Sequence, residues 1–273
     1  MTNDSPGIAA PKGKRWKRSR SVVLTYAPPA LVVIATIGLW ELLIHLLDVP
    51  TYLLAPPSLI AETIGERAPE LWSHSGVTLR ETLVGFAFAV GAGLAFGLFL
   101  HFSTIARRAL YPLLIASQSI PTVVLAPVFV LLLGFGMWPK VAIVGLFCFF
   151  PVVVGTIDGL AGVDPEYIRM MLTLDASRFG IFRRVEFPSA LPQIFTGTRV
   201  GATYAAIGAV FGEWAGSEAG LGWQMIQAKG RLDTALVFAD IVFITAMALS
   251  LFGLVSLVER LTIPWARRGG VMK

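Results

Sequence analysis

The stretch VDPEYIRMMLTLDASRFGIFRRVEFPSALP, residues 163–192, decides how this chain is organised. It is rich in charged residues of both signs, whereas the segments before and after it are long and apolar. Its apolar residues recur at the spacing of a helix face, which favours a helix over a slack linker. Pro188 and Pro192 are expected to end this helical region and to redirect the chain into the next apolar segment.

The composition of the whole chain is that of an integral membrane protein. Of the 273 residues, 55% are hydrophobic and 14% are charged, whereas soluble proteins carry about a quarter charged residues. The net charge of +5 is concentrated in basic clusters at the two ends. Such clusters next to apolar spans set membrane topology, so we assign them to contact with the lipid surface and expect no nucleic-acid partner. The single cysteine, Cys148, lies in an apolar run and excludes an internal disulfide framework.

Six apolar segments approach or exceed the length of about 20 residues that a helix needs to cross a bilayer. They cover residues 26–47, 83–100, 109–139, 141–157, 194–212 and 241–258. Residues 1–25 form a basic tail that we expect to be disordered, and residues 266–273 form a second tail. The sequence therefore predicts an all-α polytopic protein whose membrane domain occupies residues 26–265.

The basic residues also predict the orientation of these segments. With six spans, both tails, Arg107, Arg108 and residues 163–192 lie on one side of the membrane. The connections 48–75 and 213–235, on the other side, are mixed or acidic. Because basic loops stay in the cytoplasm, we expect both termini and residues 163–192 there.

Two interpretations of residues 163–192 follow from the residues alone. One is an amphipathic helix on the membrane surface, and the other is a docking element for a cytoplasmic partner. Helices that bind anionic lipid are rich in basic residues on their polar face, whereas acidic and basic residues are interleaved here. The mixture of charges favours docking, and the surface helix is the alternative.

Four stretches carry a family resemblance. The run 174–188 is similar to a loop signature that reads Glu-Ala-Ala, three residues, Gly, nine residues, Ile, any residue, Leu-Pro. Its end is kept in Val185, Phe187 and Pro188, whereas Asp175 stands at the Gly position and Arg169 at the Glu position. This signature belongs to permease subunits of bacterial ABC importers, the binding-protein-dependent type I family. The runs 119–136, 182–197 and 212–228 resemble the branch of that family that serves nitrate, taurine, sulfonates and thiamine-pyrimidine precursors.

The resemblance implies a type I importer permease in the bacterial inner membrane. Such proteins form a homodimer of six-helix subunits, with two cytoplasmic ATPase subunits and a periplasmic or lipid-anchored substrate-binding protein. Residues 163–192 would then be the coupling loop that contacts the ATPase subunits. The residues expected at that contact are Glu166, Arg169, Leu174, Asp175, Ala176, Ser177, Arg178, Phe182, Arg183 and Pro188. Asp175 is also a candidate N-cap for a second short helix, since Asp is favoured at that position.

Candidates for the translocation pathway are found at two places. Gln118, Ser119 and Thr122 flank Pro121 in the third span, and kinked, polar-lined helices are typical of substrate pathways. Kinked packing with internal hydrogen bonds is the alternative there. Glu213 lies near the outer end of the fifth span, where it is either a pathway residue or an anchor at the membrane interface.

The chain lacks the residues that hydrolyse ATP. It contains no Gly-x-x-x-x-Gly-Lys-Ser/Thr loop, so we expect ATP and Mg²⁺ on the partner subunits and no enzymatic activity here. The three histidines are scattered, which argues against a metal site. An autonomous secondary transporter is the alternative from another class, but repeated halves and charged residues at mid-membrane, which it would require, are not evident.

The solute is the least determined property. The runs 185–192 and 212–223 resemble most closely the permeases for hydroxymethylpyrimidine-type thiamine precursors, with riboflavin-type vitamins close behind. Nitrate, taurine and alkanesulfonates are the alternatives. We expect a small, largely planar heterocycle.

Overall fold

The computed structural model describes residues 14–267 and the side chains of residues 27–265. In this part of the chain all regular structure is helical, and no strand occurs. The helices are α1 Lys14–Leu46, α2 Pro57–Glu66, α3 Ala68–Phe102, α4 Thr104–Ser117, η1 Thr122–Leu125, α5 Ala126–Leu133, α6 Met137–Ala161, α7 Pro165–Thr173, α8 Arg178–Ile181, η2 Phe182–Glu186, α9 Phe187–Gly216, α10 Leu221–Gly230, α11 Thr234–Thr262 and η3 Pro264–Arg267. Helix α1 begins within the tail expected to be disordered, whose first 13 residues lie outside the described part, as do residues 268–273.

Four helices of the described chain are long and apolar enough to cross a membrane. They are α3, α6, α11 and the Ala27–Leu46 part of α1. A fifth crossing would combine α4 with residues 122–133, but these two pieces are bent by 90°. The predicted third span is therefore broken at Pro121, which lacks an N–H donor and disfavours helical geometry in the residue before it. The prediction of an all-helical membrane protein is confirmed, and the count of six spans stays a prediction.

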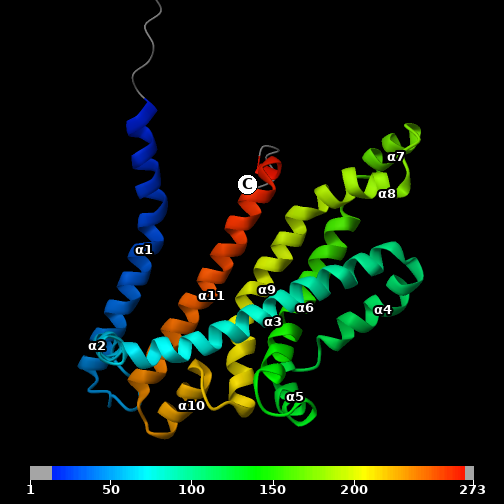
Figure 1. Ribbon diagram of the computed structural model, residues 1–273. Coiled ribbons are helices and arrows are strands. Elements are labelled where there is room, and N and C mark those ends of the chain that lie inside the picture. Colours follow the sequence, from blue (N-terminus) through cyan, green and yellow to red (C-terminus); the bar gives the residue numbers. More distant parts are fainter. Residues whose placement is uncertain (1–13, 268–273) are drawn as a thin grey trace, which may run out of the picture.

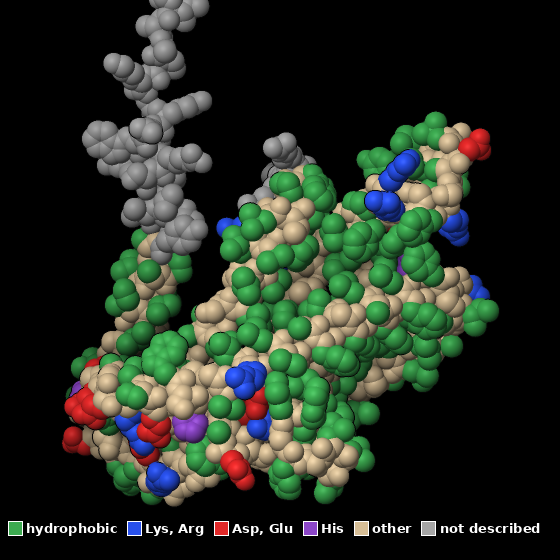
Figure 2. Space-filling view, in the orientation of Figure 1, with side chains coloured by type: hydrophobic (Ala, Val, Ile, Leu, Met, Phe, Trp, Pro, Cys, Tyr) green, Lys and Arg blue, Asp and Glu red, His purple; other side chains and the backbone are tan. Residues whose placement is uncertain are grey.

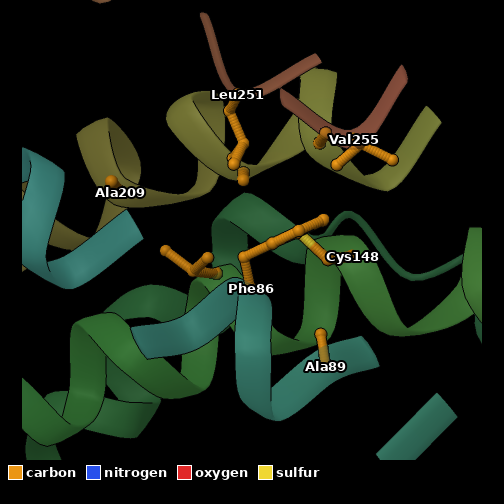
Figure 3. Close-up of a cluster of buried hydrophobic side chains, with 9 residues drawn as sticks. Phe86, Ala89, Cys148, Ala209, Leu251 and Val255 are labelled. Carbon is orange, nitrogen blue, oxygen red and sulfur yellow. The ribbon is translucent and has the colours of Figure 1, made fainter. Parts of the chain in front are cut away.

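The core lies around α6 and α9, with α3 and α11 packed against them. Figure 3 shows one of its clusters, in which α3 contributes Phe86 and Ala89, α6 contributes Cys148, α9 contributes Ala209, and α11 contributes Leu251 and Val255. Close approach of α6 to α9 depends on glycine, because a Cβ on Gly155 would lie 2.9 Å from the Cα of Gly197. Small residues at helix contacts are typical of membrane proteins.

The two ends of the molecule differ in what they carry. The start of α1, the end of α11 and the α7–α8 segment lie at one end, and α2 and α10 lie at the other (Figure 1). Figure 2 shows charged side chains mainly toward these two ends, with a largely hydrophobic surface between them. Two charged ends with an apolar surface between them are what the sequence predicts for a membrane protein. The assignment of the α7–α8 end to the cytoplasm still rests on the positive-inside rule.

Candidate functional site

Helix α7 projects from the helical body at the end that carries the start of α1 and the end of α11 (Figure 1). It begins at a capped turn, where the Asp164 carboxylate accepts a hydrogen bond from the backbone N–H of Glu166 at 2.9 Å. Pro165 occupies the first turn, where its missing N–H costs nothing. None of the residues of α7 is buried against the rest of the chain. The helix is thus defined locally by its cap and leaves its side chains available to a partner.

The turn after α7 explains the most divergent position of the loop signature. Asp175 has a positive φ of 53°, a left-handed conformation that Gly adopts freely and Asp tolerates better than most residues. Its N–H donates to the carbonyl of Leu172, and the N–H of Ala176 donates to that of Met171, both at 3.1 Å. This pair of bonds is the Schellman motif, which usually has glycine at its left-handed position. The signature therefore has Gly where the backbone requires a left-handed residue, and Asp175 meets the same requirement.

The predicted N-cap role of Asp175 is wrong. Helix α8 is capped by Ser177, whose hydroxyl accepts a hydrogen bond from the N–H of Gly180 at 3.2 Å. Asp175 instead terminates α7, two residues earlier along the chain. The favoured residue types for the two positions overlap, since Asp and Asn occur both as N-caps and in left-handed turns.

The prediction that Pro188 and Pro192 end the helical region is also wrong. The chain runs from α8 through the π-helical turn η2 directly into α9, and Pro192 lies inside α9. In η2 the N–H of Phe187 donates to the carbonyl of Phe182, five residues back. Pro188 is the second residue of α9, directly after the irregular hydrogen bonding of η2, which accommodates its missing N–H. Helix α8, the turn η2 and helix α9 therefore form one continuous helical rod, from Arg178 to Gly216.

Large side chains are exposed on α7, on the turn after it, and on α8 and η2. We call these exposed residues together the docking face; they are Tyr167, Met170, Leu172, Leu174, Arg178, Phe179, Arg183 and Arg184. Leu174 is 70% exposed and Phe179 is 68% exposed. A hollow of about 520 Å³ on this face is lined by Ser177, Phe179, Gly180, Arg183 and Arg184. Exposed large apolar side chains beside charged ones are typical of protein interaction sites.

The structure gathers the predicted ATPase-contact residues in this one corner. Glu166, Arg169, Leu174, Asp175, Ser177, Arg178 and Arg183 are exposed, whereas Ala176, Phe182 and Pro188 are partly buried. Phe182 faces α3, where its ring lies 4.9 Å from that of Phe102. It therefore packs against the helical body, on the inner side of the rod.

The predicted pathway residues are divided between two regions. Gln118, Ser119 and Pro121 are exposed at the 90° corner between α4 and α5, with Thr122 partly buried beside them. Glu213 is only 1% exposed and makes its hydrogen bonds with α3 and α10. Whether these residues line a pathway stays a prediction.

Glu213 holds the start of α10 in place. Its carboxylate accepts from the Thr78 hydroxyl at 2.6 Å and from the backbone N–H groups of Gly222 and Trp223 at 2.5 and 3.3 Å. Free N–H groups at a helix start favour a carboxylate. The residue thus has hydrogen-bond partners inside the protein, instead of the water that an interface anchor would reach.

Sequence reasoning missed a buried ion pair in the same region. The Lys140 ammonium donates to Glu81 and to the Ser217 hydroxyl, both at 2.7 Å, and Lys140 and Glu81 are buried. The pair joins α3, α6 and the loop before α10. The available signal was two ionisable residues of opposite sign, Glu81 and Lys140, each next to an apolar run.

Comparisons with known proteins agree with this architecture. Residues 87–263 match the family described as "Binding-protein-dependent transport system inner membrane component". The chain is 33% identical over 240 residues to the formylaminopyrimidine transport permease protein ThiX of Halalkalibacterium halodurans, covering 88% of this chain and 96% of that protein. It is 35% identical over 243 residues to the riboflavin transport system permease protein RibX of Chloroflexus aurantiacus, covering 87% and 91%.

A solved structure of the MetNI methionine ABC transporter in an inward-facing conformation matches with a TM-score of 0.62 and 18% sequence identity. The match covers 71% of this chain and 97% of that one, and at this identity it shows the fold alone. The matched family consists of non-enzymatic permease subunits that work with ATPase subunits and a binding protein. The chain belongs to this family, the type I ABC importer permeases, and is a multi-pass protein of the bacterial inner membrane.

Proposed function

We propose that the docking face is the surface through which this permease subunit binds its ATPase subunits. The observation that carries the proposal is the exposure of five large apolar side chains, from Tyr167 to Phe179, on two short capped helices and the turn between them. Burial of apolar surface contributes about 25 cal/mol per Å², so a partner that covers this face gains binding free energy. Charged residues lie among these apolar ones, which argues against insertion into lipid.

The continuous rod from α8 to α9 gives this contact a mechanical consequence. A displacement of the docking face can reach α9 through backbone that is helical from Arg178 to Gly216, with the π-turn η2 as its irregular part. Helix α9 is in turn packed against α6 in the core. Binding and hydrolysis of ATP, with Mg²⁺, on the partner subunits would thereby drive the rigid-body changes that alternate access across the membrane.

Charge reversal on the docking face tests this proposal. Arg183→Glu together with Arg184→Glu should reduce co-purification of the ATPase subunit at least about tenfold, since like charges placed against each other at an interface cost several kcal/mol. The matched control is Lys229→Glu with Arg231→Glu, which changes two exposed basic residues at the α10 end of the molecule and should leave co-purification intact. Unchanged co-purification of the docking-face variant would contradict the proposal.

We further propose that the solute is a small planar heterocycle of the pyrimidine or flavin type. The support is the level of identity to relatives that are named for formylaminopyrimidine and for riboflavin transport. Vesicles that contain the whole transporter should take up a labelled pyrimidine precursor or labelled riboflavin. An excess of taurine, an alkanesulfonate or nitrate should not inhibit this uptake. Uptake of an anion alone would refute this choice of solute.

We also propose that two copies of this chain form the membrane part of the transporter. When tagged and untagged copies are produced together, the complex purified through the tag should also contain the untagged copy. A complex with a different permease chain would show a heterodimer instead. Family membership decides against the alternative of an autonomous secondary transporter, and we expect transport only when the ATPase subunits are present.

A further inference from the structure

The inner side of the rod carries a contact that the docking proposal does not use. Glu186, the last residue of η2, is 7% exposed, and its carboxylate lies 3.1 Å from Nε2 of His101 in the last turn of α3. The ring of Phe182 lies 6.1 Å from that of His101 and packs edge-on against that of Phe102. The π-helical turn is thus tied sideways to the end of α3.

A lateral tie matters here because of the type of turn it holds. π-Helical turns interrupt the regular hydrogen-bond ladder and often mark functional positions, and interruptions of the ladder are places where helices bend. The rod has its π-turn close to the docking face and can bend at this turn. Such a bend would absorb part of any displacement of the docking face. Contacts on both Phe182 and Glu186 hold this turn against α3.

We propose that His101 and Glu186 are a positioning pair that makes α3 follow the docking face when the ATPase subunits move it. This inference rests on the proposed docking function. The packing of Phe182 alone would allow η2 to slide along α3. The buried carboxylate of Glu186 must keep its hydrogen bond to His101, and this requirement fixes one position of η2 relative to α3. Arg178 and Thr104 line the same cavity, of about 210 Å³, beside His101 and Glu186. No ion pair between Arg178 and Glu186 forms in the described part of the chain, so His101 is the partner that connects to α3.

The test measures solute molecules transported per ATP hydrolysed, with the complete transporter and its binding protein in proteoliposomes. His101→Leu keeps an apolar side chain of similar size and removes the hydrogen bond. We expect this variant to lower the ratio about five- to tenfold, because a hydrogen bond to a buried charged group is lost. His101→Gln can still donate to Glu186 and should restore the ratio to within about twofold of the original protein.

The control is His45→Leu, which breaks another His–Glu contact, of 2.9 Å, inside α1, and should leave the ratio unchanged.

A purely structural role predicts a different result. Transport and ATP hydrolysis by His101→Leu would then fall together with the yield of folded protein, and an unchanged ratio would refute the proposal. If His101→Leu does not assemble, Glu186→Leu, which removes the acceptor and keeps a side chain of similar size, must lower the ratio for the proposal to stand. The ATPase subunit should co-purify normally with His101→Leu. Failure of the docking proposal is seen separately, as retention of the ATPase by the Arg183 and Arg184 variant.

Discussion

Replacing Asp175 by glycine should strengthen the turn between α7 and α8. The left-handed conformation at φ 53° costs a residue with a Cβ about 1–2 kcal/mol, less for Asp, and costs glycine nothing. Glycine loses about 0.5–1 kcal/mol through its greater freedom in the unfolded chain. The net gain for the local turn is therefore on the order of 0.5 kcal/mol or less over Asp, whereas Asp175→Ala should lose about 0.5–1 kcal/mol because alanine lacks the tolerance of Asp.

The suitable assay is hydrogen exchange at the amide of Ala176, which is bonded across the turn to Met171. Local opening controls this exchange, and 1 kcal/mol corresponds to about a fivefold change in an equilibrium. We expect exchange at or slightly below the original rate for Asp175→Gly and about two- to fivefold faster exchange for Asp175→Ala. Equal acceleration by both variants would refute the reasoning, because it would show that the carboxylate and not the backbone conformation stabilises the turn.

Two further predictions concern the helical body. Gly155→Ala should lower stability by about 1–3 kcal/mol, measured as a lower Tm, because its Cβ would lie 2.9 Å from Gly197; Gly91→Ala, which has nothing within 4 Å, should not. Glu213→Leu should lower Tm and speed exchange of the Gly222 amide, since loss of a buried acceptor costs about 1–3 kcal/mol. Glu213→Gln keeps one acceptor oxygen and should lose less, and equal losses would show that charge is the deciding property.

The apolar runs predicted the long helices correctly, because a helix that faces lipid or other helices needs only length and hydrophobicity. The break at Pro121 shows the limit of that reasoning. A run of more than 20 uncharged residues is compatible with a straight helix or with two helices at 90°, and composition does not distinguish them. Prolines were also over-interpreted at Pro188 and Pro192, because a π-turn upstream placed the first of them where its missing N–H is tolerated.

The candidate site was located from the sequence, but its geometry was not. The mixed charges of residues 163–192 indicated a docking element, whereas the inward direction of Phe182 depends on where the end of α3 lies. The same holds for the contact between His101 and Glu186, which are 85 residues apart in the sequence. The ion pair between Lys140 and Glu81 joins residues 59 apart. Pairs of this kind follow from packing, and a single sequence carries no periodic signal for them.

The two irregular turns of the docking segment differ in where their stability comes from, and this difference suits their positions. The left-handed turn at Asp175 is exposed, and its hydrogen bonds come from its own backbone. It therefore keeps its shape whether or not a partner is bound. The π-turn at η2 is partly buried and is held by side chains of α3. A displacement of the docking face should thus leave the first turn unchanged and act on the contacts of the second, so that α3 and α9 respond to the same movement.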